Sequence, residues 1–357
     1  MRIIQIIDSL EAGGAERMAV NYANALADAI EFSGLIATRK EGTLFQHINP
    51  NVSYLFLNKK RQLDVTALFR LRAFAVKNKV THVHAHSTSF FFAFLLKLIC
   101  PSLFLIRHDH YGNNEFLATR PHTVLKRTAA FFKGVIAVNQ KLKEWSEQEL
   151  KAKNVIYLPN FPIKEMNVFD HTILKEIAGK RIVSLANLRE QKNHFLLLKV
   201  AKKLKNYNPD WTFHLVGKDF DDAYSFQIKK LIKEYHLEQN VFLYGSKQDI
   251  ENILNQASIA VLTSQSEGLP VALLEYGLYQ KAVVVTNVGE IPTIVQHGKN
   301  GYIVTTNNSD MFYQSLVNLI ENETLRVEFG KALYDRIQAE YDAESVIKKY
   351  LKWLQIS

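Results

Sequence analysis

The chain has 357 residues, which exceeds the size at which a single hydrophobic core usually stops growing, so two domains are expected. Its composition is that of an ordinary globular protein, and its longest apolar run, Phe90 to Cys100, is interrupted by Lys97 and is too short to span a bilayer. The single cysteine excludes an intramolecular disulfide, and the N-terminus has no signal-peptide layout. These features predict a cytoplasmic protein.

Charge is distributed unevenly along the chain. Residues 1–163 contain 21 Lys and Arg against 12 Asp and Glu, whereas residues 164–357 contain 23 of each, so the formal charge of +9 lies in the first half. A basic half suits an acidic substrate, an anionic membrane surface or nucleic acid, and the run Lys59 to Arg61 with Lys77 and Lys79 forms local patches. A solvated basic surface is the alternative. Nucleic acid ranks last, because interleaved aromatic residues and a known binding motif are missing.

The first half alternates short apolar runs with helical stretches. Ile3 to Ile7 is typical of a strand covered on both faces, and a turn containing Gly13 and Gly14 leads into a helix from Glu16 to about Ala29. The glycine pair would let the backbone approach a ligand closely, although the pattern is not GxGxxG and a plain tight turn is nearly as well favoured. Further strands are predicted at Phe32 to Ala37, Val52 to Leu57, Thr81 to Ala85, Leu103 to Arg107, Val135 to Val138 and Val155 to Leu158.

The segment Pro159 to Pro162 breaks this alternation and is predicted to be a linker. A second series of strands follows at Arg181 to Ala186, Thr212 to Val216, Val241 to Tyr244, Ile259 to Thr263, Ala282 to Thr286 and Tyr302 to Val304. The alternation predicts an α/β protein in which each half is a parallel sheet with helices on both faces. A helical stretch from about Glu340 could pack back on the first domain. We therefore predict one domain at 1–162 with 340–357, and another at 163–339.

Two glutamates flank a Gly-Leu-Pro turn in the second half. Glu267 follows a strand-like run, and Glu275 lies in an apolar helix that Pro270 could open at its first position. A helix start carries unpaired N–H groups and a positive dipole end, so the backbone at Gly268, Leu269 and Pro270 is a natural seat for an anion. The glutamates would repel a bare phosphate, but they can accept hydrogen bonds from hydroxyl groups attached to it. This describes a nucleotide sugar, with hexose on one side and ribose on the other.

Four features together resemble a known enzyme family. They are Glu267-Gly-Leu-Pro with Glu275, which forms an EX7E motif, the strand Val283 to Gly289, the segment Ala186 to His194, and the N-terminal Gly-Gly-Ala-Glu. In combination they resemble a retaining GT-B glycosyltransferase of family 4, and the resemblance covers nearly the whole chain. It implies two doubly wound, Rossmann-like domains facing a cleft, with a C-terminal helix that returns to the N-terminal domain.

The resemblance also implies roles for individual residues. Glu267 would bind hydroxyls of the donor sugar, Glu275 would bind the ribose, and Lys192 would bind the diphosphate, while Gly13 and Gly14 would face the phosphates from the first domain. The chemistry is consistent with this, because a lysine at a strand end can neutralise a departing nucleoside diphosphate.

The chain departs from the family pattern in two places. Asn187 stands where the family often has arginine, so either Arg189 supplies the second positive charge or the loop relies on Lys192 and backbone donors. After Gly289 the family often continues with a second glycine and a glutamate, whereas Glu290 follows here, which adjusts the turn and the next helix.

Five histidines follow or lie on two neighbouring strands. His82, His84 and His86 alternate and therefore share one face, while His108 and His110 end the next run. A zinc site is conceivable, but no cysteine is near and the spacing matches no known type, so hydrogen-bonded structural histidines are favoured.

The resemblance places His108 near the donor sugar and the bond being made, so we expect it to be catalytic. Asp109, beside it, and His86 are candidates on the acceptor side. The acidic segment Asp219 to Asp222 resembles the DxD motif of metal-dependent glycosyltransferases of another fold. We interpret it as a solvated loop and predict that no metal ion and no other cofactor is required.

These observations predict a metal-independent transferase that moves a hexose from a nucleoside diphosphate sugar to an acceptor with retention of configuration. His108, Lys192 and Glu267 are the expected catalytic residues, and UDP is the nucleotide that the family favours. The basic first domain suggests a glycan or lipid-linked glycan acceptor in cell-surface polysaccharide synthesis, met at the inner membrane face. A nucleotide-sugar epimerase of the same fold and a non-catalytic nucleotide-sugar-binding subunit are the alternatives.

Overall fold

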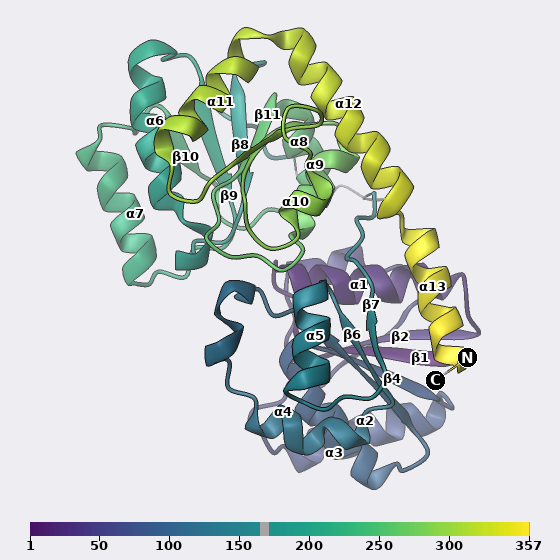
Figure 1. Ribbon diagram of the computed structural model, residues 1–357. Coiled ribbons are helices and arrows are strands. Elements are labelled where there is room, and N and C mark those ends of the chain that lie inside the picture. Colours follow the sequence, from purple (N-terminus) through teal and green to yellow (C-terminus); the bar gives the residue numbers. More distant parts are fainter. Residues whose placement is uncertain (165–170, 357) are drawn as a thin grey trace. The chain divides into compact units, whose positions relative to one another are not determined.

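The computed structural model describes residues 1–164 and 171–356, and the chain divides into two units (Figure 1). Unit 1 consists of Met1–Phe161 with Ala343–Ser357, and unit 2 of Pro162–Asp342. Residues 165–170, which fall in the predicted second domain, and residue 357, at the end of the predicted returning helix, lie outside the described residues.

Unit 1 is built on a seven-stranded sheet in the order β3-β2-β1-β4-β5-β6-β7, in which every pairing is parallel. Five consecutive residues of the central strand β1 are buried, because helices must cover both faces of a parallel sheet. The strands are β1 (Arg2–Ser9), β2 (Phe32–Lys40), β3 (Ser53–Phe56), β4 (His82–His86), β5 (Phe104–Asp109), β6 (Gly134–Ala137) and β7 (Val155–Tyr157). The α-helices are α1 (Gly14–Ala27), α2 (Val65–Lys77), α3 (Phe90–Ile99), α4 (Thr123–Thr128), α5 (Gln140–Gln148) and α13 (Ala343–Ile356). Short 3-10 helices lie at η1 (Thr43–His47), η2 (Ser87–Ser89), η3 (Asn114–Thr119) and η4 (Ala129–Phe131).

Unit 2 has a six-stranded parallel sheet in the order β10-β9-β8-β11-β12-β13. The strands are β8 (Arg181–Leu185), β9 (Thr212–Val216), β10 (Val241–Leu243), β11 (Ile259–Leu262), β12 (Ala282–Thr286) and β13 (Tyr302–Val304). The helices are η5 (Glu190–Lys192), α6 (His194–Tyr207), α7 (Ala223–Glu234), α8 (Ile250–Gln256), α9 (Val271–Leu278), α10 (Ile291–Ile294), α11 (Ser309–Glu321) and α12 (Glu323–Glu340). Strand order reverses between β8 and β11, and ligands of such sheets bind beyond the carboxyl ends of the strands at this point.

The predicted doubly wound fold class is confirmed, and each predicted strand has a counterpart in the structure. Differences are confined to element ends. The first helix begins at Gly14 rather than Glu16, and Pro270 is the N-cap residue before α9 rather than its first helical residue. The last helix begins at Ala343, since Glu340 is the final residue of α12. Helix ends are hard to predict to the residue, because adding or removing one or two residues hardly alters the periodicity of the apolar pattern.

Helix α13 packs on unit 1, as the sequence predicted. Tyr350 is fully buried, with its ring 5.3 Å from that of Tyr22 in α1. Trp353 donates a hydrogen bond from Nε1 to Oδ1 of Asn154, at 2.8 Å. Gly134 lies under the same indole, where a Cβ atom would come within 2.4 Å of the ring, so the close approach requires a glycine. The last helix is therefore part of the core of unit 1.

Replacing Tyr350 by alanine is expected to lower the free energy of unfolding of unit 1 by about 3 kcal/mol or more, because truncating a fully buried aromatic side chain leaves a cavity. The Tyr350→Phe variant is the matched control. The Tyr350 hydroxyl is buried without a hydrogen-bond partner among the described residues, so its removal should leave stability unchanged or raise it. Urea denaturation of the three proteins measures both effects, and equal losses in the two variants would contradict this account.

Candidate active site

The loops that follow β8 and β11 are tied together by hydrogen bonds. The hydroxyl of Thr263, just after β11, donates to the backbone oxygen of Lys192 at 2.9 Å. The backbone N–H of Gln265 donates to the oxygen of Gln191 at 2.8 Å. Since β8 and β11 are neighbours in the sheet, these bonds bring two segments about 70 residues apart in sequence to the same edge. Lys192 and Glu267 are held on these two loops.

Lys192 and Glu267 are in direct contact. The ammonium of Lys192 donates to Oε1 of Glu267 at 2.5 Å, and the hydroxyl of Ser264 donates to the same oxygen at 2.6 Å. Glu267 is 4% exposed, whereas the Lys192 side chain keeps 20% of its surface accessible. The carboxylate is thereby fixed in one orientation, and the lysine faces solvent beside it.

Gly289 supports the loop that carries Glu267. Its φ of +54° lies in the left-handed region, and a Cβ atom there would come within 2.2 Å of the Glu267 backbone oxygen and 2.7 Å of that of Gly268. The next residue, Glu290, donates its N–H to the Gly268 oxygen at 3.0 Å. Residue 290 therefore fixes the loop through its backbone N–H, a bond that does not depend on its side chain.

Helix α9 carries Glu275 next to this loop. Glu275 is partly exposed, and the adjacent Tyr276 is fully buried, with its hydroxyl accepting from the Leu185 N–H at 2.7 Å. Burial raises the pKa of the Tyr276 phenol, so this hydroxyl stays neutral and serves as an anchor. This bond ties α9 to the end of β8, and the residues that precede α9, Gly268, Leu269 and Pro270, are buried.

The two residues considered for the family's second cation have different surroundings. Asn187 accepts from the backbone N–H of Lys218 at 2.7 Å, so its side chain joins the loops after β8 and β9. Arg189 lies with its guanidinium 4.7 Å from the centre of the Phe220 ring. The structure thus gives Asn187 a positioning contact, whereas Arg189 is exposed and stacks on one ring at the same edge of the sheet.

In unit 1, Gly13 and Gly14 form the connection from β1 to α1. Gly13 is the N-cap residue, with extended backbone at φ −170°, and its carbonyl accepts from Arg17 at 2.8 Å. The atoms nearest to a Cβ at Gly13 would be those of the Glu16 carboxylate. The predicted strand, glycine turn and helix are therefore present, at the carboxyl end of β1.

Four histidines form a cluster with their rings against one another: His84 and His86 of β4, His108 of β5, and the partly exposed His110 directly after β5. His84 Nε2 lies 3.0 Å from His108 Nδ1, and His86 Nδ1 lies 3.0 Å from His110 Nε2. The other nitrogen of His86 is 2.8 Å from the Gln5 amide oxygen. His84, His86 and His108 are fully buried. The favoured interpretation as hydrogen-bonded histidines agrees with these contacts.

Three of these histidines also form the group of possible metal ligands among the described residues. One nitrogen from each of His84, His86 and His108 lies within 4.8 Å of the others, so these three are the set that could hold an ion. In the acidic segment, Asp219 pairs with Lys229 at 2.5 Å, and Asp222 caps α7 by accepting from Ser225 at 2.9 Å. The acidic segment is therefore engaged in helix capping and ion pairing.

Asp109 is held by arginines. Both of its oxygens accept from Arg120, at 2.8 and 2.9 Å, and Arg107 lies 3.3 Å away. Arg120 in turn packs over the rings of Tyr111 and Trp145. Although burial opposes it, the two arginines keep the pKa of Asp109 below its usual value. This geometry gives Asp109 a structural ion pair rather than an open acceptor contact.

The histidine cluster predicts a loss of stability in acid. Burial holds the pKa values of His84, His86 and His108 well below the usual 6.5, and that of His110 at about 4. Above pH 6.5 the rings are neutral in both states. As pH falls below 6.5, the unfolded chain takes up protons that the folded chain does not, so the free energy of unfolding decreases by about 1.4 kcal/mol per pH unit for each ring.

Urea denaturation at about pH 8 and about pH 5 measures this loss. The His110→Gln variant should lose less stability between the two conditions than the unmodified protein. The exposed His171, replaced by glutamine, is the control and should lose as much as the unmodified protein. Identical losses in all three proteins would show that the cluster does not titrate as its burial predicts.

Comparison with known proteins identifies the family. A family model described as "Glycosyl transferases group 1" matches residues 170–336, and one described as "Glycosyltransferase Family 4" matches residues 12–161. Together they cover the second sheet and all strands of the first sheet except β1. The chain belongs to the group 1 and family 4 glycosyltransferases, which have the GT-B fold.

Among curated relatives, the poly(ribitol-phosphate) alpha-N-acetylglucosaminyltransferase of Staphylococcus aureus is 24% identical over 265 residues. The match covers 70% of this chain and 52% of that protein, so the chain spans about half the length of this relative. An amylovoran biosynthesis glycosyltransferase of Erwinia amylovora is 23% identical, with 98% of each chain covered. Among solved structures, Anabaena HepE in complex with UDP and glucose has a TM-score of 0.78 at 18% identity, with 100% of both chains covered.

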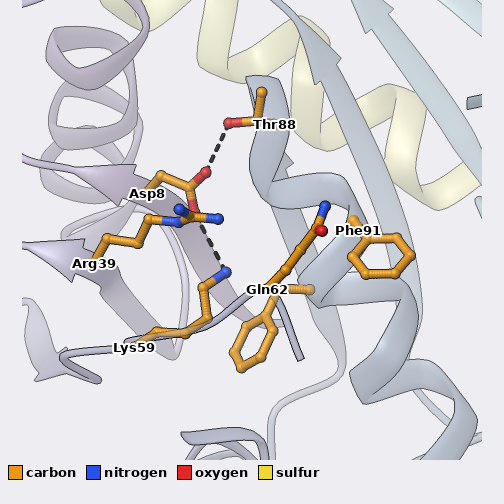
Figure 2. A pocket seen from close by; sticks show the side chains of 7 residues that line it. Asp8, Arg39, Lys59, Gln62, Thr88 and Phe91 are labelled. Carbon is orange, nitrogen blue, oxygen red and sulfur yellow. Dashed lines mark hydrogen bonds and ion pairs between the residues drawn. The ribbon is translucent and has the colours of Figure 1, made fainter. Parts of the chain in front are cut away.

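The sequence analysis missed a group of polar residues in unit 1. Asp8 near the end of β1, Arg39 near the end of β2 and Thr88 after β4 line one cavity (Figure 2). Lys59 lines it as well and is 8% exposed, so its assignment to an exposed basic patch was wrong. A usable signal was present, because each of these residues stands close to the carboxyl end of a predicted strand.

Proposed function

We propose that the protein transfers a hexose from a UDP-linked sugar to a glycan or lipid-linked glycan, with retention of configuration and without a metal ion. The part of this proposal that concerns the sugar donor, its donor half, rests on the Lys192–Glu267 pair. This pair lies where the strand order of the second sheet reverses, and α9 carries Glu275 beside it. Glu267 accepts hydrogen bonds from sugar hydroxyls, and Glu275 accepts them from the ribose. HepE, with UDP and glucose bound, supports UDP as the nucleotide.

In this proposal Lys192 stabilises the departing diphosphate. An ammonium has three N–H donors, so Lys192 can keep its bond to Glu267 while donating to phosphate oxygens. The backbone N–H groups at the start of α9 add further donors where negative charge develops. The departing phosphate takes the acceptor proton, so the scheme needs no separate base. The role of His108 at the reacting bond stays a prediction from the resemblance, because its ring is fully buried in the histidine cluster.

The acceptor half of the proposal places the acceptor on unit 1. This unit contains 24 Lys and Arg against 13 Asp and Glu, whereas unit 2 contains 20 against 22. A basic surface concentrates acidic acceptors. The two relatives support a surface glycan, since one is named for poly(ribitol-phosphate) and the other for amylovoran biosynthesis.

We further propose that helix α2 brings unit 1 to an anionic membrane surface. Its residues Val65, Phe69 and Val76 are 62%, 56% and 60% exposed and form one stripe at helical spacing. Exposed Arg72 lies within this stripe, three residues after Phe69 and four before Val76, and exposed Arg61, Lys77 and Lys79 lie near its ends. Such a helix lies in the interface plane, with apolar side chains in the lipid and cations at the head groups. No helix among residues 1–164 and 171–356 has the length and apolar character needed to cross a bilayer.

Sedimentation with vesicles tests this surface. Vesicles containing phosphatidylglycerol should retain the protein at low salt, and the Phe69→Ser variant should be retained less. Vesicles of phosphatidylcholine alone should retain little. Equal sedimentation of the protein with and without anionic lipid would overturn the membrane contact and leave the donor half intact.

Thermal-shift measurements with UDP-glucose, UDP-N-acetylglucosamine and GDP-mannose test the donor half, because a ligand that binds only the folded state raises the melting temperature. We expect a shift with a UDP-sugar. Transfer of radiolabel from that sugar to a glycan acceptor then distinguishes the candidates. Label recovered only as free or epimerised sugar would indicate an epimerase, and tight binding without turnover would indicate a binding subunit.

A further inference from the structure

Unit 1 contains a cavity of about 340 Å³ at the carboxyl ends of its central strands (Figure 2). Asp8 and Arg39 belong to β1 and β2, Lys59 and Gln62 follow β3, and Thr88 lies in η2 directly after β4. Phe91 and Phe92 of α3 supply apolar surface. This volume is at the lower end of the range for small-molecule pockets, which fits one sugar- or polyol-sized group.

Asp8 is the anchor of this cavity. Its Oδ1 accepts from the hydroxyl of Thr38 at 2.5 Å, and its Oδ2 accepts from that of Thr88 at 2.7 Å. The cations lie further off, with Arg39 Nε at 3.8 Å and Lys59 Nζ at 3.7 Å from Oδ1. The threonines therefore hold the carboxylate, and the carboxylate attracts both cations without a short hydrogen bond to either.

Lys59 is a buried ammonium with unused donor capacity. Its side chain is 5% exposed, and its Nζ lies 4.4 Å from the centre of the Phe92 ring. Burial lowers its pKa, while the charge of Asp8 opposes that shift. A buried cation that is paired only at 3.7 Å gains when an anion approaches within hydrogen-bond distance. Arg39, half exposed across the cavity, offers a second set of donors to the same anion.

We infer that this cavity binds an anionic group of the acceptor, a phosphate or a carboxylate, between Lys59 and Arg39. The inference rests on the proposed function, since it gives the acceptor of that reaction its chemical class. Two cations against one carboxylate leave the lining with an excess positive charge. An uncharged polyol offers the Lys59 ammonium hydroxyl acceptors but no counter-charge, whereas an anion supplies both. Phe91 and Gln62 line the cavity beside this anion site and contact the carbon skeleton and hydroxyls of the same group.

Equilibrium binding of small probes to the full chain tests the site. The probes are glycerol 3-phosphate, malonate and, as the uncharged control, glycerol. The unmodified protein should bind at least one of the anions roughly tenfold or more tightly than glycerol, since a charge-assisted hydrogen bond contributes at least this factor. The stronger anion identifies phosphate or carboxylate as the group. Equal affinity for all three probes would overturn the inference.

Variants locate the binding. Lys59→Gln and Arg39→Gln should each weaken anion binding by about tenfold and leave glycerol binding unchanged. The exposed Lys230, paired with Glu234 on the surface of unit 2, provides the control Lys230→Gln, which removes the same charge elsewhere and should bind as the unmodified protein does. Anion binding that survives in both cavity variants would place the site elsewhere and overturn the inference.

UDP-glucose binding, measured in the same proteins, separates the two proposals. Lys59→Gln and Arg39→Gln should bind UDP-glucose normally if they are folded, because both residues belong to unit 1 and the proposed donor residues Lys192 and Glu267 to unit 2. Failure of the unmodified protein to bind any nucleotide sugar would contradict the proposed function while leaving the anion site standing. Normal nucleotide-sugar binding without selectivity for the anionic probes would contradict the anion site and leave the proposed function standing.

Discussion

The Lys192→Ala variant is expected to lower the rate of sugar transfer by roughly 100-fold to 1,000-fold, the size of effect seen when one donor to a developing negative charge is removed. The Lys192 ammonium lies 2.5 Å from Oε1 of Glu267 and keeps part of its surface accessible, which suits the proposed contact with the diphosphate. The loss should appear mainly in kcat, because the charge on the diphosphate grows as the glycosyl bond breaks.

The variant should lose some stability, because the Lys192 ammonium is the counter-ion of the buried Glu267 carboxylate, but it should remain folded. Glu267 keeps the hydroxyl of Ser264 at 2.6 Å, and the Lys192 backbone keeps its bond from Thr263, so the loop retains its other ties. Lys230→Ala removes an exposed lysine of unit 2 and is the activity control. Steady-state kinetics and urea denaturation of the three proteins give both readouts. Near-normal turnover in a folded Lys192→Ala protein would rule out the proposed role.

The Gly289→Ala variant is expected to disrupt donor binding, although Gly289 has no side chain that could contact the donor. Its φ of +54° costs about 1 to 2 kcal/mol in any residue with a Cβ atom. The larger effect is steric, because the added carbon would come within 2.2 Å of the Glu267 backbone oxygen and 2.8 Å of its carbonyl carbon. Relief requires the Glu267–Gly268 backbone to move, and a displacement of about 1 Å in a positioning loop can cost 100-fold in rate.

Gly298 supplies a control that isolates the steric effect. Its φ is +74°, but a Cβ there would have nothing within 4 Å, so Gly298→Ala has the backbone strain without the collision. We expect Gly298→Ala to lose only about 1 to 2 kcal/mol of stability and to bind UDP-sugar normally. Calorimetric titration of both variants with the donor identified by thermal shift tests this. Equal donor affinities in the two variants would mean that the loop tolerates the displacement.

Much of the fold was accessible from sequence. Periodicity located each strand of both sheets, because a parallel strand covered on both faces needs a continuous apolar run such as Ile3 to Ile7. The EX7E motif, with its Gly-Leu-Pro turn, identified the loop that carries Glu267 and the helix that carries Glu275. The apolar runs and the EX7E motif are local signals, because each lies within a single strand or within one strand, the turn after it and the next helix.

What only the tertiary structure decided is how distant segments meet. Lys192 and Glu267 lie 75 residues apart in the sequence, and they meet because β8 and β11 are neighbours in the sheet. No local sequence pattern predicts that pairing of strands. Lys59 has the sequence context of an exposed basic run, yet it is buried because its segment folds over α3 to face Asp8, 51 residues earlier. Composition and periodicity determine which apolar residues enter the core and roughly where each strand lies. Strand order determines which side chains share an edge, and it follows from the packing of the whole sheet.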